Sequence, residues 1–227
     1  LAGINAKYIH SNLGIYSIRA YALSHGIESQ QLELAEYTIN QNKEDVLADI
    51  YQRKPDFAAF SCYIWNIDYV KYLAAHLHKL MPELPIWLGG PEVSFQSKEL
   101  LKELPWLTGI LCGEGEVSFL EVLLAYQNDR GSGTQERLGR VRGIAFHKGR
   151  IWGQRDSIVE EDQTTEEKLI CKTEEIIPLN MDSLPFPYEY MADMKELSHR
   201  IVYYETSRGC PFGCSYCLSS IEKQVRF

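Results

Sequence analysis

The chain contains, at residues 56–63, the stretch DFAAFSCY, which is apolar at nearly every position. A strand that helices cover on both faces reads as a continuous apolar run, whereas a half-exposed strand alternates between apolar and polar residues. The stretch therefore predicts a central strand of a parallel α/β sheet. A helix is expected to follow from residue 67 to residue 81, because the residue before Pro82 disfavours helical backbone.

The same alternation of a short apolar run and a helical segment extends on both sides of this stretch. Five such units are expected between residue 1 and about residue 128, which predicts a doubly wound, flavodoxin-like or Rossmann-like α/β domain with a five-stranded parallel sheet. The strands are expected at residues 1–4, 30–35, 56–63, 86–88 and 109–112. The first helix is expected to begin after Ser11 or Asn12 and to end at Gly26, and the others to cover residues 44–53, 67–81, 97–104 and 117–127.

The part of the chain after this domain carries weaker signals. Residues 129–134 are glycine, serine and polar residues, which predicts a linker. Residues 141–147 and 150–154 flank Lys148 and Gly149, which predicts a β-hairpin at the edge of the sheet. The acidic residues 156–175 predict a solvated connector, and residues 201–205 predict a strand that leads into a group of cysteines.

Composition narrows the class of protein. The chain has 23 basic and 31 acidic residues and a net charge of −8, which argues weakly against nucleic acid as a partner. Its apolar runs have the length of strands and are too short to span a bilayer, and no signal-peptide pattern begins the chain. A cytoplasmic protein without a membrane span is expected.

The six cysteines are unevenly distributed. Three stand alone, whereas Cys210, Cys214 and Cys217 lie within eight residues in the pattern C-x3-C-x2-C. Three thiolates can bind three irons of a cubane and leave the fourth iron open to a substrate. The alternatives are a zinc site that uses His199 or a residue from outside this chain, and buried cysteines without a metal.

This cysteine loop resembles that of the radical S-adenosylmethionine (SAM) superfamily, including the aromatic Tyr216 before the last cysteine. The resemblance implies that Cys210, Cys214 and Cys217 hold a [4Fe-4S] cluster. It also implies that SAM binds the open iron, with Tyr216 near the adenine, and is cleaved by one electron to methionine and a deoxyadenosyl radical. A flavodoxin or ferredoxin reductant and a small-molecule substrate of unknown identity are expected as partners.

The loops at the carboxyl ends of the expected strands are the second candidate site, because doubly wound sheets bind ligands there. They carry His10 after the first strand, Ser61 and Tyr63 after the third, Gly89 and Gly90 after the fourth, and Gly113 and Glu114 after the fifth. This set resembles the cobalamin-binding domain that precedes many radical SAM barrels, and the resemblance implies that these residues bind cobalamin. Tight strand-to-helix turns are the simpler reading of the glycines, and the positive end of a helix could equally attract Glu114 and Glu116.

The first loop departs from the pattern D-x-H-x-x-G that is typical of cobalamin carriers. Tyr8 stands where aspartate would orient a ligating His10, and Leu13 stands where the glycine would be. Tyr63 replaces the leucine of S-x-L, although the 27 residues between Ser61 and Gly89 match the family spacing. Cobalamin is therefore expected without a histidine ligand from the protein, and His10 as a capping or pocket-lining residue.

Together these resemblances predict the front part of a cobalamin-dependent radical SAM enzyme, which would carry out methyl transfer or oxidative or cyclisation chemistry, as magnesium-protoporphyrin IX monomethyl ester cyclases do. Residues 1–130 would form the cobalamin-binding domain, 131–198 the edge hairpin and linker, and 199–227 the start of a (β/α) barrel that the chain does not complete. Such a fragment is expected to be inactive by itself. The alternatives are a radical SAM enzyme whose first domain has lost cobalamin and binds substrate or a partner protein, and a non-catalytic metal-binding module.

Overall fold

The computed structural model describes residues 1–127, 133–148, 170–191, 194–217 and 224–227. Within them, seven strands form one sheet in the order β2-β1-β3-β4-β5-β6-β7. The first five strands are parallel: β1 (Ala2–Asn5), β2 (Ala35–Thr38), β3 (Ala58–Ser61), β4 (Ile86–Gly89) and β5 (Gly109–Leu111). The predicted doubly wound α/β fold with a five-stranded parallel sheet is confirmed.

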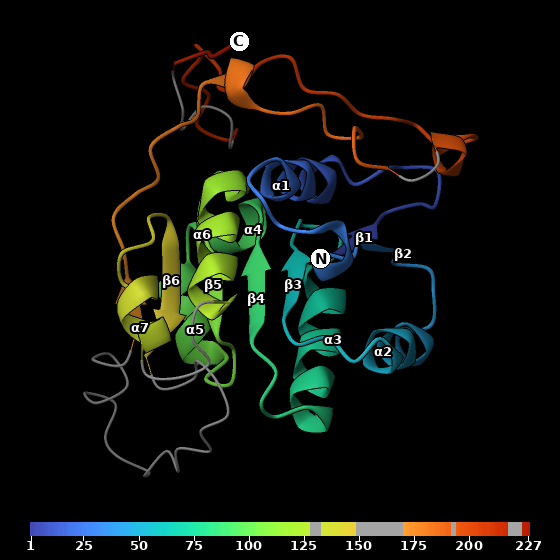
Figure 1. Cartoon of the computed structure of the whole chain (residues 1–227), viewed down its shortest axis with the longest axis vertical. Helices are drawn as coiled ribbons and strands as arrows, with labels where there is room; N and C mark the ends of the chain where they lie inside the picture. The colour runs from blue at the N-terminus through green and yellow to red at the C-terminus, as the bar shows by residue number, and fades with distance from the viewer. Residues whose placement is uncertain (128–132, 149–169, 192–193, 218–223) are drawn as a thin grey trace.

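Helices cover both faces of this sheet (Figure 1). They are α1 (Leu13–Ser24), α2 (Lys43–Gln52), α3 (Ile67–Leu80), α4 (Pro91–Ser94), α5 (Ser97–Glu103), α6 (Gly115–Gln127) and α7 (Gly133–Leu138), with short 3-10 turns at Ser29–Gln31, Met181–Ser183 and Met194–Leu197. The α1 and α6 helices pack together in one buried cluster, and α2 and α3 in another. The sheet is therefore sandwiched between two helical layers.

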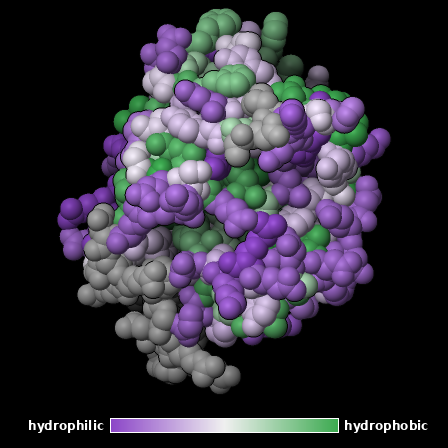
Figure 2. Space-filling model, turned by 45° about the vertical axis from the view of Figure 1, so that its right-hand side comes forward, coloured by the Kyte–Doolittle hydropathy of each residue, from purple (hydrophilic) through white to green (hydrophobic). Residues whose placement is uncertain are grey.

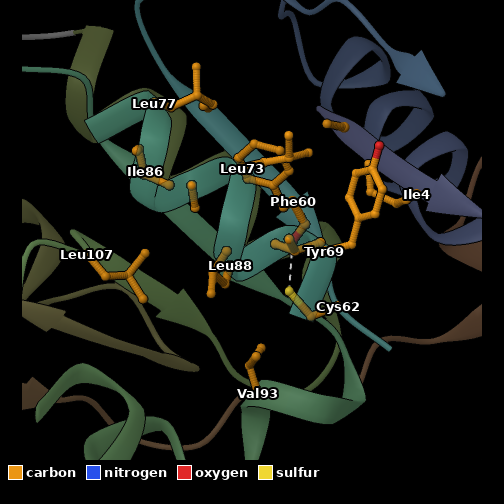
Figure 3. Close-up of a cluster of buried hydrophobic side chains, with 14 of the residues drawn as sticks. Ile4, Phe60, Cys62, Tyr69, Leu73, Leu77, Ile86, Leu88, Val93 and Leu107 are labelled. Carbon is orange, nitrogen blue, oxygen red and sulfur yellow. Dashed lines mark hydrogen bonds between the residues drawn. The ribbon is translucent and has the colours of Figure 1, made fainter. Parts of the chain in front are cut away.

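The β3 strand shows why residues 56–63 are apolar at nearly every position. Ala58 and Phe60 face the cluster of α2 and α3, whereas Ala59 between them faces the cluster of α1 and α6. Phe60 lies beside Leu73 and the Cys62 thiol (Figure 3). Burial of such a side chain stabilises the fold by about 1.5–3 kcal/mol.

The second strand was predicted in the wrong place. Residues 29–31 form a 3-10 turn with a capping box between Glu28 and Gln31, and β2 begins only at Ala35. Leu32 is buried beyond the turn, so the apolar residues that suggested a strand anchor a turn instead. Pairing with β1, in the register Ala2 to Ala35, sets the observed start of the strand.

The far edge of the sheet is extended by antiparallel strands. β6 (Ile144–His147) pairs with β5, and β7 (Ile170–Lys172) pairs with β6. The first strand of the predicted hairpin is thus confirmed, while its second strand at 150–154 and the connector up to residue 169 lie outside the described residues. The prediction of a connector up to residue 175 is wrong at its end, because Ile170–Lys172 pairs with β6 as a strand. The predicted linker at 129–134 is partly outside them too, and at Gly133 it gives way to α7, whose Leu138 is buried against the α1 and α6 cluster.

The described residues from 176 onward cross the carboxyl ends of the parallel strands, as the orange to red trace in Figure 1 shows. The strand predicted at 201–205 is wrong for the described structure, since only Ile201 forms an isolated bridge, with His10. Ile201 and Tyr204 are 46% and 63% exposed, and among the described residues no strand pairs along this stretch.

No described helix is long and apolar enough to cross a membrane. On the face drawn in Figure 2, hydrophobic residues reach the surface in separate patches between hydrophilic ones. The expected domain boundaries at residues 130 and 198 stay predictions.

Candidate cofactor site at the carboxyl edge of the sheet

The strand order reverses between β1 and β3. The loops that follow these two strands therefore run to opposite sides of the sheet, and doubly wound sheets bind their ligands at the point between such loops. The Asn12 amide bridges the two loops by donating to Ser61 Oγ over 3.1 Å. Gly3 makes room for it, because a Cβ there would lie 2.6 Å from Asn12 Nδ2. Asn12 Oδ1 is buried without a hydrogen-bond partner among the described residues, which leaves an unused acceptor at this point.

Glu36 at the middle of β2 holds the β1 loop in place. One carboxylate oxygen accepts from Asn5 Nδ2 at 3.1 Å and from the Asn12 backbone N–H at 2.9 Å. The other accepts from the Tyr16 hydroxyl at 2.7 Å and from Arg200 at 2.6 Å. Burial, together with the hydrogen bond to Glu36, raises the pKa of Tyr16. Sequence reasoning missed Glu36, because its strand was assigned to earlier residues.

His10 lies in this loop and is oriented by Tyr203 rather than by a carboxylate. The Tyr203 hydroxyl lies 2.7 Å from His10 Nδ1, and the two rings stack with centroids 5.8 Å apart. The backbone carbonyl of His10 accepts from Asn5 and Arg200 at 2.9 and 2.8 Å. Tyr8, at the position of the missing aspartate, is 77% exposed.

The β3 loop is fixed to β1 by Asn66. Its amide donates to the carbonyls of Ile4 and Ser61 at 2.9 and 3.0 Å, and its oxygen accepts from the Tyr63 N–H at 2.8 Å. The rings of Tyr63 and Trp65 lie 4.5 Å apart and nearly parallel. Burial raises the pKa of the Tyr63 hydroxyl.

The glycines after β4 and β5 form tight turns. Gly90 has φ 107°, and a Cβ at this position would lie 2.5 Å from the carbonyl oxygen of Cys62. Gly89, in contrast, would accept a side chain at ordinary contact distance from Leu111. Ser94 Oγ donates to the Gly90 carbonyl at 2.8 Å and accepts from the Gly113 N–H at 3.3 Å, so it links the two turns. The simpler reading of Gly90, a steric need of the turn, is therefore sufficient for that residue.

Glu114 and Glu116 flank the start of α6 and bind arginines of the C-terminal segment. Arg208 donates to Glu116 at 2.6 and 3.2 Å, and Ser17 donates to the same carboxylate at 2.8 Å. Glu114 pairs with Arg226 and lies 3.3 Å from an Arg208 nitrogen. The carboxylate of Glu114, predicted to bind a cofactor, is thus engaged by protein groups here.

The charges of this group stabilise one another. Burial alone would raise the pKa of Glu116, but the hydrogen bonds and charge of Arg208 outweigh it and hold that pKa below its usual value. Burial alone would likewise lower the pKa of Arg208, and the contacts with Glu116 and Glu205 raise it instead. Both side chains are therefore ionised at neutral pH.

The predicted cluster ligands lie on the segment that follows Arg208. Cys210, Cys214 and Cys217 are partly buried thiols, and the Cys217 N–H donates to the Cys214 carbonyl at 3.1 Å. Three thiols on one short loop suit an iron–sulfur cluster chemically. Across the described part of the chain, however, no three histidine, cysteine or acidic side chains are gathered as metal ligands. Tyr216 is 91% exposed.

The loops after β1 and β3 also expose large apolar side chains at this edge, and Phe95 is exposed at the end of α4: Tyr8, Ile9, Ile64, Trp65 and Phe95. Exposed apolar groups beside polar ones are typical of ligand sites. The unused acceptor of Asn12 and this apolar rim fit a large ring system that carries amide groups, as cobalamin does.

Comparison with known proteins identifies the domain. Residues 1–123 match the family model described as the B12 binding domain. The chain belongs to the B12-binding domain family. The loops described above are therefore those of a B12-binding domain, and the match ends inside α6, before the segment with the three cysteines.

Relatives of this chain are named as methyltransferases and as a cyclase. It is 27% identical over 171 residues to the cobalamin-dependent radical SAM methyltransferase TokK of Streptomyces tokunonensis, with 72% of this chain and 22% of the relative covered. It is 27% identical over 178 residues to the anaerobic magnesium-protoporphyrin IX monomethyl ester cyclase of Cereibacter sphaeroides, with 77% and 26% covered. It is 29% identical over 180 residues to the uncharacterized methyltransferase PH0819 of Pyrococcus horikoshii, with 78% and 34% covered.

The chain spans between about a fifth and a third of these relatives. Among solved structures, it resembles the cobalamin-dependent S-adenosylmethionine radical enzyme OxsB with aqua-cobalamin and S-adenosylmethionine bound. The TM-score is 0.70 at 16% identity, and 99% of this chain and 29% of OxsB are covered. At this identity the likeness supports the fold alone, and it extends over the C-terminal segment as well as the B12-binding domain.

Proposed function

We propose that this chain is the cofactor-binding front part of a cobalamin-dependent radical SAM enzyme. The observation that carries the proposal is the order of the two parts: a B12-binding domain over residues 1–123, followed by C-x3-C-x2-C at 210–217. The methyltransferase TokK and the magnesium-protoporphyrin cyclase align with 72% and 77% of this chain. Methyl transfer and oxidative or cyclisation chemistry are therefore the two proposed reaction classes.

The residues that would hold cobalamin lie in the loops after β1, β3, β4 and β5: Asn12, Ser61, Tyr63, Gly89, Gly90 and Gly113. Asn12 would offer its buried oxygen to an amide group, and the stacked pair of Tyr63 and Trp65 would offer a flat apolar wall. Cys210, Cys214 and Cys217 would hold the [4Fe-4S] cluster, with Tyr216 near SAM. When bound, a reduced cluster supplies the electron that cleaves SAM, and cobalamin supplies methyl-group or one-electron chemistry.

We expect His10 not to bind the cobalt. A ligating imidazole gains basicity from a carboxylate on its other nitrogen, and His10 Nδ1 has the weaker Tyr203 hydroxyl at 2.7 Å. His10 would instead tie the β1 loop to the C-terminal segment. A small-molecule substrate and a flavodoxin or ferredoxin reductant complete the proposal, and neither is identified by the described residues.

Titration of the protein with hydroxocobalamin tests the first cofactor. The expected result is a shifted corrinoid spectrum and about one corrinoid retained per chain after gel filtration. Lys43→Ala, on α2, is a control that should bind equally well. A chain that retains no corrinoid at micromolar concentration would refute cobalamin binding and favour a domain that binds substrate or a partner protein instead.

Anaerobic reconstitution of the full-length protein with iron and sulfide tests the second cofactor. The expected result is about four irons per chain, lost when Cys210, Cys214 and Cys217 are all replaced by alanine. Reduction should then cleave added SAM to methionine. A reconstituted cluster that leaves SAM intact would refute the radical SAM assignment.

A further inference from the structure

Four charged side chains form a nearly buried group between the B12-binding domain and the cysteine segment. We call it the Arg–Glu clamp: Glu114, Glu116, Arg208 and Arg226. Their side chains are only 15%, 4%, 13% and 13% exposed. Arg208 bridges both acids of the domain, at 2.6 Å to Glu116 and 3.3 Å to Glu114, and also contacts Glu205 at 2.8 Å. Two glutamates and two arginines neutralise each other at this interface.

The acidic half of the clamp is held rigidly by the domain. Ser17 of α1 donates to Glu116 at 2.8 Å. Gly115 lies so close to α1 that a Cβ there would be 2.8 Å from the Ile18 side chain. Glu116 also lies in the first turn of α6, where the helix dipole favours a negative charge. The two carboxylates therefore present a fixed target to the arginines.

The basic half of the clamp closes the chain around the cysteines. Arg208 and Arg226 form an antiparallel backbone bridge, with N–H to carbonyl distances of 2.9 and 2.8 Å. Cys210, Cys214 and Cys217 all lie in the chain between these two arginines. Arg226 also donates to the Leu179 carbonyl at 2.6 Å, and the Leu179 N–H donates to Glu114 at 3.3 Å. Both arginines thus contact Glu114, and Arg208 contacts Glu116 as well.

The arrangement of the clamp fixes the orientation of its side chains more closely than is needed only to hold the two segments together. Apolar side chains of similar size stabilise an interface as well as a buried ion pair does, whereas a planar guanidinium with several acceptors fixes one orientation. Arg208 lies two residues before Cys210, the first cysteine. Fixing the Arg208 side chain therefore also restricts the backbone that carries the thiols.

We propose that the Arg–Glu clamp is a positioning device for the cluster loop. Arg208 and Arg226 seat the loop against the first turn of α6, so that the geometry of the bound cluster depends on a glutamate 92 residues earlier in the B12-binding domain. In this proposal Arg208 and Glu116 are positioning residues, which act through the backbone of the cysteine loop. The proposal rests on the proposed function, because it assumes a cluster on the three cysteines.

The test compares Glu116→Gln, Arg208→Gln, Arg208→Lys and the double variant Glu116→Gln/Arg208→Gln in the full-length protein. Glu103→Gln is the matched control, because it breaks a partly exposed ion pair between α5 and α3, with Lys71 at 3.0 Å, outside the Arg–Glu clamp. Each protein is reconstituted anaerobically and reduced. The readouts are iron per chain, the electron paramagnetic resonance spectrum of the cluster with and without SAM, and hydrogen exchange of the cysteine segment. Retained hydroxocobalamin shows that the domain of each variant is folded.

We expect Glu116→Gln and Arg208→Gln to keep cobalamin binding and to speed exchange of the segment at least tenfold. Their clusters should give an altered electron paramagnetic resonance spectrum, and the change in that spectrum on addition of SAM should be at least fivefold smaller. In Arg208→Lys the spectrum and its change with SAM should lie between those of the unmodified protein and of Arg208→Gln. Glu103→Gln should match the unmodified protein. If the unmodified protein forms a cluster and the clamp variants give the same spectrum and the same change with SAM, the positioning proposal is overturned while the proposed function stands. If the unmodified protein forms no cluster, the proposed function fails, and the positioning proposal fails with it.

Discussion

Replacement of Gly90 by alanine tests the turn that joins β4 to α4, and Gly26→Ala provides its control. Both glycines have positive φ, at 107° and 95°. They differ in space: a Cβ at Gly90 would lie 2.5 Å from the Cys62 carbonyl oxygen and 3.0 Å from its nitrogen, whereas a Cβ at Gly26 meets nothing within 4 Å. The pair therefore separates the cost of the backbone conformation from the cost of the steric clash.

The size of each effect follows from these contacts. At Gly26 only the backbone term applies, and alanine should lower the free energy of unfolding by about 1–2 kcal/mol. At Gly90 the backbone lies in a region essentially reserved for glycine, at ψ 173°, which costs about 1–3 kcal/mol. The clash adds about 1–3 kcal/mol, because the opposing atoms belong to backbone that cannot rotate away. The Cys62 N–H is itself bound to the Gly89 carbonyl at 2.7 Å.

Urea denaturation followed by circular dichroism measures both losses. The midpoint should fall further for Gly90→Ala than for Gly26→Ala, with an unchanged slope m in both. Gly90→Ala should also weaken hydroxocobalamin binding, since the turn borders the proposed site. Equal losses for the two variants would refute the steric argument, because the clash is the main structural difference between them.

Three further predictions concern the polar groups. Glu36→Gln should lower the free energy of unfolding by about 3–5 kcal/mol, because it leaves Arg200 as a buried unpaired charge, and a loss below 1 kcal/mol in urea denaturation would contradict this. His10→Ala should change the dissociation constant of hydroxocobalamin by less than about threefold, whereas a loss of one hundredfold in the same titration would indicate cobalt ligation. Because the pKa of Glu116 is lowered in the folded chain, its stabilising contribution is complete above the unfolded value of about 4.3 and disappears as pH falls through the lower folded value. The free energy of unfolding should therefore fall more steeply below about pH 4 for the unmodified protein than for Glu116→Gln, and parallel curves would contradict the assignment.

Where an element is built from local signals, sequence reasoning located it well. The helix predicted at 67–81 is observed at Ile67–Leu80, and the strand predicted at 86–88 is observed at Ile86–Gly89. Where an element depends on contacts with distant parts of the chain, sequence reasoning located it wrongly or missed it. The start of β2 is set by its register with β1, and α7 is too short to be read from periodicity and depends on the burial of Leu138.

The candidate site divides in the same way. The loops after β1, β3, β4 and β5 were predicted correctly as carboxyl-edge loops, because a doubly wound sheet brings these ends to one side. Tyr203 as the partner of His10 was not predictable, since 193 residues separate them. Nor were the arginine partners of Glu114 predictable, and its predicted role in cofactor binding stays a prediction.

The sequence by itself determined the α/β class, the loops at the carboxyl ends of the parallel strands and the cysteine loop, because each depends on neighbouring residues. Apolar runs, glycine turns and thiol spacing act over a few positions and need no distant partner. Only the tertiary structure decided that Glu36 meets Arg200 and that Glu116 meets Arg208, which are 164 and 92 residues away. The sequence does not show whether a glutamate is exposed to water or paired with an arginine. The packing of α1, α6 and the C-terminal segment excludes water from these glutamates, and that packing is a property of the tertiary structure.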